Sequence, residues 1–354
     1  MAPPRRVRDE ALTLRRTGLR DIELFRARES IYLHQYPTQG RFQVAPNARA
    51  IAFTTPGADT LTVVRHDGII TNVANPVHDL FRFSPDGRTL FVLQHWEGRL
   101  VVGRVDVPSL QVVSRTPISG APWMEVCAEG IVIPDNHYNA GAFDCDIMLL
   151  PWNGEPRVVA HVDSVVNRLV CAKAGQTIAY FAKSRVWMIP NIGAEPVLVA
   201  HEGADVTNAE MSPDGRSLLV LTAKDAHLFQ DGKLAKTLGM AQAHTVWFSY
   251  DGRQFVVANE QKAVWQRGDK TAVLERTEKA PIRTARFAPM SPWLMVARGG
   301  DAIRWNPDQD DVQIIASADE GQEMLAADVF GGGVLIWTGS TWEIEKWPGA
   351  KKGL

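Results

Sequence analysis

The feature that most constrains the fold is a short turn sequence that recurs along the chain. FSPDGRTLFVL at Phe83–Leu93 is nearly repeated as MSPDGRSLLVL at Met211–Leu221 and as FSYDGRQFVVA at Phe248–Ala258. Serine favours the first position of a tight turn, proline presets φ at the second, and aspartate and glycine suit the third and fourth, where an open or left-handed conformation is needed. Apolar, β-rich runs flank each turn, so each copy predicts two antiparallel strands joined by a tight turn.

The same pattern extends to eight candidate units, spaced by roughly forty residues. Their turns fall at residues 45–50, 84–89, 128–130, 172–177, 212–217, 249–254, 288–293 and 330–333. Two weaker strands follow each turn, as at Arg99–Val105 and Gln111–Pro117, or on either side of the hairpin signal Asp231-Gly232. Four short strands per unit and little helical periodicity predict an all-β array. The third and eighth units are recognised mainly by position, so seven units remain the alternative.

The two ends of the array are complementary. The last unit lacks a fourth strand, and the chain ends in PGAKKGL. IYLHQY at residues 31–36 is a strand-like run with no unit of its own. The sequence therefore predicts ring closure, in which this N-terminal strand completes the last unit and pairs an otherwise exposed edge.

These repeats resemble those of TolB-like and YVTN-type β-propellers, which are related to WD-repeat proteins, over residues 30–348. The resemblance implies an all-β fold, a single β-propeller of eight four-stranded blades (alternatively seven), whose faces commonly bind partners. Of the Gly-His and Trp-Asp signatures of true WD repeats, only traces such as His78 and His244 remain. Recurring tryptophans are expected to pack between neighbouring blades. They are Trp152, Trp187, Trp265, Trp305 and Trp347.

Residues 1–29 stand outside the repeat and are predicted to be a basic helical N-terminal extension; residues 349–354 form a C-terminal tail. Two helical segments are expected, Arg8–Arg16 and Leu19–Arg28, broken at Thr17-Gly18. This segment contains eight arginines and five acidic residues. One interpretation is a basic element for an acidic partner or nucleic acid; the other is a solvated helix face.

Composition limits the function classes. The chain has 354 residues and a net charge of −2, so the whole molecule lacks the basic character of a nucleic-acid binder. Three cysteines without a CxxC pair argue against a disulfide framework or a structural zinc site and favour small buried residues. The N-terminus has no secretory signal pattern, and no run is long enough to span a membrane. A cytoplasmic protein with no membrane contact is expected.

Catalytic motifs are absent from the sequence: it has neither a GxSxG elbow nor an HExxH helix. No catalytic residue, metal ligand set or cofactor is predicted. One segment stands out, PDNHYNAGAFDCD at residues 134–146, as a long loop on a rigid scaffold. Its oxygen and imidazole groups suit a divalent cation, but the spacing of a calcium loop is missing, so an Asx-turn surface loop is the competing interpretation. The partner-binding candidates here are Asp135, Asn136, His137, Tyr138 and Asp144.

Two further groups of candidates come from the innermost strands and the loops that enter them. The loops contribute His78, Trp123 and His244 as partner-binding candidates. Charged residues ahead of each turn are predicted to line a central channel: Arg82, Glu125, Glu210, Arg286 and Asp328. Their mixed signs indicate salt-bridged neighbours, with a small polar or anionic ligand as the alternative.

The leading functional hypothesis is a non-enzymatic scaffold that binds another protein, within a multi-protein complex, through propeller-face loops or the N-terminal extension. Nucleic acid is expected only through that basic extension. The alternative is an enzyme or small-molecule binder, such as a metal-assisted lactonase-like hydrolase, with its site at the channel mouth. That alternative requires acidic or histidine ligands converging from several blades, and the sequence shows no matched acidic set.

Overall fold

The computed structural model describes residues 11–14, 22–25, 42–45, 50–55, 60–65, 69–74, 76–121, 123–139, 142–152, 154–166, 168–183, 185–200, 206–277, 280–288, 293–317, 326–330, 333–337 and 342–346. Every named element in these residues is a β-strand. In the same residues, no helix is long and apolar enough to cross a membrane. The chain divides into two compact units, a mid-chain unit of residues 73–242 and a terminal unit of residues 1–72 with 243–354.

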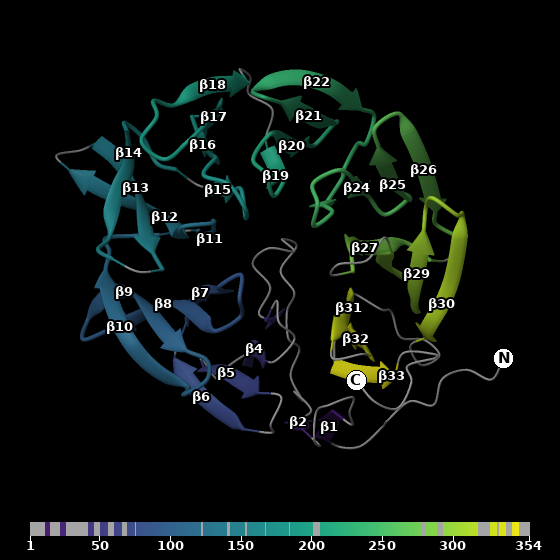
Figure 1. Ribbon diagram of the computed structural model, residues 1–354, viewed down its shortest axis with the longest axis horizontal. Helices are drawn as coiled ribbons and strands as arrows, with labels where there is room; N and C mark the ends of the chain where they lie inside the picture. Colours follow the sequence, from purple (N-terminus) through teal and green to yellow (C-terminus); the bar gives the residue numbers. More distant parts are fainter. Residues whose placement is uncertain are drawn as a thin grey trace. The chain divides into compact units, whose positions relative to one another are not determined.

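The mid-chain unit consists of antiparallel sheets of four strands, each built from strands consecutive in sequence (Figure 1). The first two sheets contain β7 (Pro76–Phe83), β8 (Thr89–Trp96), β9 (Arg99–Asp106), β10 (Gln111–Pro117), and β11 (Glu125–Val126), β12 (Gly130–Asn139), β13 (Ala142–Pro151), β14 (Arg157–Val162). The next two contain β15 (Arg168–Cys171), β16 (Ile178–Ala182), β17 (Arg185–Ile189), β18 (Val197–Ala200), and β19 (Val206–Met211), β20 (Ser217–Thr222), β21 (Ala226–Gln230), β22 (Lys233–Leu238). The first strands of successive sheets contact one another, β7 with β11, β11 with β15 and β15 with β19.

The terminal unit repeats this plan in three more four-stranded sheets. They contain β3 (Phe42–Val44), β4 (Ala50–Thr55), β5 (Thr60–Arg65), β6 (Ile70–Ala74); β23 (Thr245–Phe248), β24 (Phe255–Ala258), β25 (Lys262–Arg267), β26 (Lys270–Glu275); and β27 (Ile282–Phe287), β28 (Leu294–Arg298), β29 (Asp301–Asn306), β30 (Asp311–Ser317). Among the described residues, the last sheet has three strands, β31 (Ala326–Phe330), β32 (Gly333–Trp337) and β33 (Trp342–Lys346). All eight predicted turns therefore lie between the first two strands of a sheet.

The repeated turn has the chemistry that its sequence predicts. Ser84 Oγ donates to Asp86 Oδ1 at 2.6 Å and accepts from Thr89 N at 2.9 Å, while Asp86 Oδ1 also accepts from Arg88 N. Gly87 has a φ of 67°, the left-handed region that glycine adopts without strain. Burial alone would raise the pKa of Asp86, but the hydrogen bonds from Ser84 and Arg88 outweigh it and lower that pKa. The same bonds recur at the other two close copies.

The cores lie between neighbouring sheets. One buried cluster joins the sheets that begin at β7 and β11, a second joins those at β11 and β15, and a third joins those at β15 and β19. In the terminal unit, the fully buried Trp265 and Trp305 belong to a cluster shared by the sheets that begin at β23 and β27. Trp152 and Trp187 pack at the margins of two mid-chain clusters. The predicted inter-sheet packing of these four tryptophans is confirmed; Trp347 lies outside the described residues.

The three cysteines are buried free thiols, as their number and spacing predict. Burial raises the pKa of Cys127 and raises that of Cys145 to about 12. Burial also raises the pKa of Cys171 well above its ordinary value. Because the thiolate is the reactive form, these side chains serve as small apolar residues of the core.

The predicted helices of the N-terminal extension are wrong where the structure describes this segment. β1 (Ala11–Leu14) and β2 (Ile22–Phe25) are antiparallel strands that pair from Ala11↔Phe25 to Leu14↔Ile22. The physical reason is that so short an apolar run fits both the helical and the strand periodicity. Leu12 and Leu14 alternate as they would in a strand. The eight arginines and residues 31–36, the proposed closing strand, lie outside the described residues.

Candidate functional site

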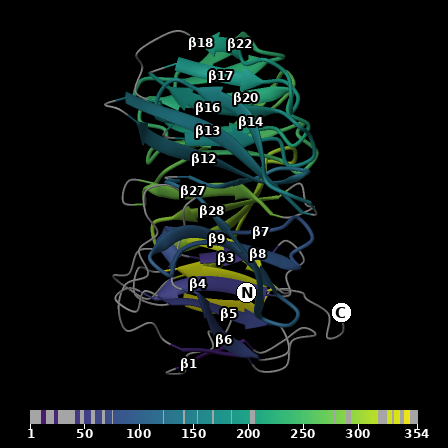
Figure 2. The same cartoon turned by 90° about the vertical axis from the view of Figure 1, so that its left-hand side faces the viewer.

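The segment expected to be a surface loop is a continuation of two strands. β12 and β13 pair in one register from Gly130↔Pro151 to Asn139↔Ala142, and Figure 2 shows them side by side. We call their outer parts, residues 134–139 and 142–146, the hairpin arm. The sequence suggested a loop because Asp, Asn and His favour turns. Here the paired strand and the neighbouring β14 supply the backbone partners, which overrides that local preference.

Two of the predicted contact residues hold the base of the hairpin arm. The buried Asp135 accepts hydrogen bonds at one carboxylate oxygen from Ser119 N at 2.7 Å and Gly120 N at 2.9 Å. The amide side chain of Asn136 donates to Val166 O and accepts from Val166 N, as a neighbouring strand would. These bonds join β12 to the connections before β11 and before β15, so the arm begins from a fixed base.

The tip of the hairpin arm presents an aromatic pair to solvent. Tyr138 and Phe143 are directly paired across the strands, with ring centroids 4.8 Å apart. Their residues are 65% and 55% exposed. Exposed aromatic side chains on rigid supports are typical anchors of protein interfaces, because little conformational entropy is lost on binding. The sequence singled out Tyr138; Phe143 was missed, although its pairing follows once the hairpin register is known.

Imidazole and carboxylate groups gather along the hairpin arm and β14. Asp146 Oδ2 lies 3.4 Å from His137 Nε2, and Asp146 Oδ1 lies 2.9 Å from His161 Nδ1. The hydrogen bond to Asp146 is the main cause that raises the pKa of His161, with further contributions from Asp144 and Asp163. Within the described residues, no group of three or more His, Cys, Asp or Glu side chains is arranged to hold a metal ion.

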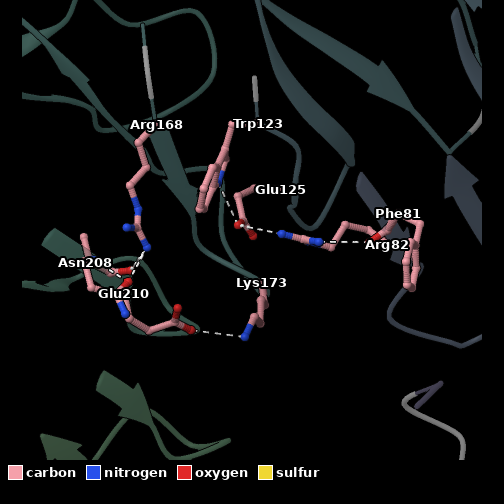
Figure 3. Close-up of polar contacts among 9 residues, drawn as sticks. Phe81, Arg82, Trp123, Glu125, Arg168, Lys173, Asn208 and Glu210 are labelled. Atoms are coloured by element: carbon pink, nitrogen blue, oxygen red, sulfur yellow. Dashed lines mark hydrogen bonds and ion pairs between the residues drawn. The ribbon is translucent and has the colours of Figure 1, made fainter. Parts of the chain in front are cut away.

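A second polar cluster lies on the first strands of the mid-chain sheets, as Figure 3 shows. We call it the inner-strand network; it consists of Arg82, Trp123, Glu125, Arg168, Lys173, Asn208 and Glu210. Arg82 Nη2 lies 3.5 Å from Glu125 Oε1, and Arg82 Nη1 donates to the carbonyl of Phe81 at 2.9 Å. Trp123 Nε1 donates to the same oxygen of Glu125 at 2.9 Å. Arg82 and Glu125 thus form an ion pair of the kind that the mixed signs predict.

The other half of the network joins β15 to β19. Arg168 lies over the ring of Trp123, 4.6 Å from its centroid, and donates to Asn208 Oδ1 and to backbone carbonyls of β19. Lys173 Nζ donates to Glu210 Oε1 at 3.2 Å. Burial raises the pKa of Glu210 despite the opposing effect of Lys173, and the charge of Glu210 raises the pKa of Lys173. Arg82 and Lys173 therefore each lie beside a carboxylate, whereas Arg168 is held by an aromatic ring, an amide oxygen and backbone carbonyls.

The remaining predicted residues lie in β7 or in the terminal unit. His78 is in β7, but its side chain is not described. His244 belongs to the terminal unit, where its Nδ1 lies 3.0 Å from Thr245 Oγ1 and burial lowers its pKa. Arg286 is half-buried in β27, and Asp328 is in β31 without a described side chain.

Comparisons with known proteins complete this description. No family model and no curated protein sequence matches the chain. Solved structures do: a chain of the mitotic checkpoint complex, at 12% identity and a TM-score of 0.52, covers 98% of this chain and 94% of its own length. Hsv2 of Kluyveromyces lactis matches at 12% identity and a TM-score of 0.50, over 77% of this chain and 96% of its own. Kuenenia stuttgartiensis hydrazine synthase matches at 11% identity and a TM-score of 0.52, over 88% and 95%.

Together, the repeated four-stranded antiparallel sheets and these matches place the chain in the β-propeller class of folds. Within that class it is structurally similar to WD-repeat proteins. At these identities the likeness shows the fold alone, since one fold supports many activities. Function has to be argued from the sites.

Proposed function

We propose that the chain is a non-enzymatic scaffold that binds a partner protein, and that the hairpin arm is its docking element. One observation carries the proposal: an exposed aromatic pair, Tyr138 and Phe143, stands on a strand extension whose base is pinned by buried hydrogen bonds. A rigid aromatic tip contributes large contact area at a small entropic cost. The fold supplies the platform, and a chain of the mitotic checkpoint complex has a similar fold.

The inner-strand network supports the same proposal because its contacts suit a structural role rather than a ligand site. Each of its two carboxylates already has a cationic partner, Arg82 for Glu125 and Lys173 for Glu210, which is the arrangement of a structural element. Structural ion-pair networks shift pKa values as functional sites do, so the raised pKa values of Glu210 and Lys173 do not by themselves mark a ligand site. The scaffold hypothesis therefore locates recognition on the hairpin arm.

We further propose that the eight sheets are the blades of one propeller and that residues 31–36 complete the last blade. The support is the three-stranded sheet β31–β33, together with the contact between β1 and β33, which brings the N-terminal part of the chain to that sheet. A chain that starts at residue 30 should stay folded, although it loses the contact of β1 with β33, and one that starts at residue 38 should aggregate or unfold. Equal stability of the two truncations would rule out this closure.

Affinity purification from the native host tests the docking element. The wild-type chain should recover a stoichiometric partner, and the double variant Tyr138→Ala, Phe143→Ala should lose it at unchanged melting temperature. Tyr250→Ala is the matched control, because Tyr250 is 77% exposed in the β23–β24 turn. The proposal fails when the double variant retains the partner, or when the control loses it equally.

A further inference from the structure

The register of the hairpin arm places its ionisable groups on one face. His137 pairs with Asp144, Asp135 pairs with Asp146, and Asp146 pairs with His161 of β14. Directly paired residues of an antiparallel sheet project to the same side, and alternate residues share a face. These five residues therefore line one side of the sheet, which we call the acidic face. Tyr138 and Phe143 project to the other side, at the tip.

On the acidic face, carboxylates outnumber imidazoles. Asp135, Asp144 and Asp146 lie there with His137 and His161, so an excess of negative charge remains whether or not the two rings are protonated. Asp146 uses one oxygen for each ring. Asp163, directly after β14, adds a further carboxylate 3.5 Å from His161 Nε2.

The outer part of this face is open to a partner. The side chain of Asp163 is 93% exposed, that of His161 is 56% exposed and that of Asp146 is 30% exposed. They lie on or beside β14, the edge strand of its sheet in the described chain. Asp135, in contrast, is buried and engaged with backbone N–H groups. Asp146 and Asp163 are therefore carboxylates that a partner can reach.

We propose that the segment bound by the hairpin arm is basic, with a lysine or arginine that contacts Asp146 and Asp163 and an apolar or aromatic side chain that packs on Tyr138 and Phe143. The proposal rests on the proposed function and names the chemistry of its partner. From Phe143 to Asp146 the strand rises about 10 Å. An extended segment of a few residues that passes over the edge of the arm can reach both groups. Opposite charges across the contact would give the specificity and fast association that such steering provides.

A random peptide library displayed on phage tests this chemistry with the full-length chain as bait. Selection is run in parallel on the wild type and on the Tyr138→Ala, Phe143→Ala variant, so that peptides dependent on the arm are identified. We expect these peptides to carry a net positive charge beside an aromatic or aliphatic residue. Synthetic copies should bind the Asp146→Asn, Asp163→Asn variant at least about tenfold more weakly than the wild type.

A matched control removes the same two charges elsewhere. Asp269 and Asp310 are exposed turn residues of the terminal unit, and their double replacement by asparagine should leave peptide affinity unchanged. The inference is overturned when the arm-dependent peptides are acidic or neutral, or when the Asp146→Asn, Asp163→Asn variant binds them as tightly as the wild type; docking on the arm then still stands. Selection of no arm-dependent peptide contradicts the docking proposal itself.

Discussion

The inner-strand network and the hairpin arm use similar residues for opposite purposes. In the network, the two carboxylates, Glu125 and Glu210, each lie beside a cation from a neighbouring sheet or its turn, Arg82 or Lys173. On the arm, acids gather with imidazoles on one face, while an aromatic pair at the tip has no cover within the described chain. The comparison teaches that recurrent inner-strand positions carry contacts between sheets, whereas the hairpin arm leaves its aromatic side chains exposed.

The largest effect on stability is expected from a substitution that removes an ion pair of the inner-strand network. Arg82→Ala leaves Glu125 without its guanidinium partner in a poorly solvated place, and we expect the free energy of unfolding to fall by about 3 kcal/mol. Peptide capture by the arm should persist at temperatures where the variant is folded. Urea denaturation measures the loss, with Arg82→Lys as the charge-preserving control. A loss below about 1 kcal/mol would mean that this pair behaves as an exposed salt bridge.

The next effect concerns the base of the arm. Asp135→Ala deprives the N–H groups of Ser119 and Gly120 of their acceptor, which should cost about 2 kcal/mol of unfolding free energy. Asp135→Asn keeps an acceptor oxygen and should cost less. Hydrogen exchange of the two amides is the direct measurement. Unchanged protection in the alanine variant would show that the arm does not depend on this contact.

A smaller effect is a change in how stability depends on pH. Burial raises the folded-state pKa of Glu210, so the unfolded chain releases this proton first as pH rises. The contribution of Glu210 is therefore present at acid pH and is lost as pH rises through the raised pKa. Between about pH 4 and pH 7, Glu210→Gln should lose less unfolding free energy, or gain more, than the wild type. Parallel pH profiles of the two proteins would contradict this assignment.

The smallest effect on stability should come from the tip of the arm. Replacing Tyr138 and Phe143 by alanine removes exposed rings, and we expect the unfolding free energy to change by less than about 0.5 kcal/mol. A thermal melt with the Tyr250→Ala control measures this. A loss similar to that of Arg82→Ala would mean that the aromatic pair is part of the core, and the contrast between the two regions would disappear.

The sequence predicts the parts of this fold whose causes are local. Ser84, Asp86 and Gly87 make the bonds and the left-handed φ that their turn needs, because all partners lie within six residues. Among the described residues, the spacing of such turns locates each sheet except the β1–β2 pair. The hairpin arm was mistaken for a loop because its strands are stabilised by pairing and by bonds to distant residues such as Val166, which turn propensities do not include.

The inner-strand network was predicted in part for a similar reason. Arg82, Glu125 and Glu210 are each the second-to-last residue of the first strand of a sheet, so the repeat reveals them. Arg168 stands two residues earlier in its strand than that position, and Lys173 lies in the turn after it. Their contacts join sheets that are about forty residues apart in the sequence. A short sequence pattern does not predict a contact over that separation.

The three buried cysteines have a practical consequence for labelling. Because burial raises the pKa of each thiol, maleimide and iodoacetamide reagents should find no reactive sulfur in the native chain. A cysteine introduced in place of Phe143 would then be the reactive position in an otherwise silent molecule. A fluorophore or spin label can thus be attached to the hairpin arm without removing any native residue from the core.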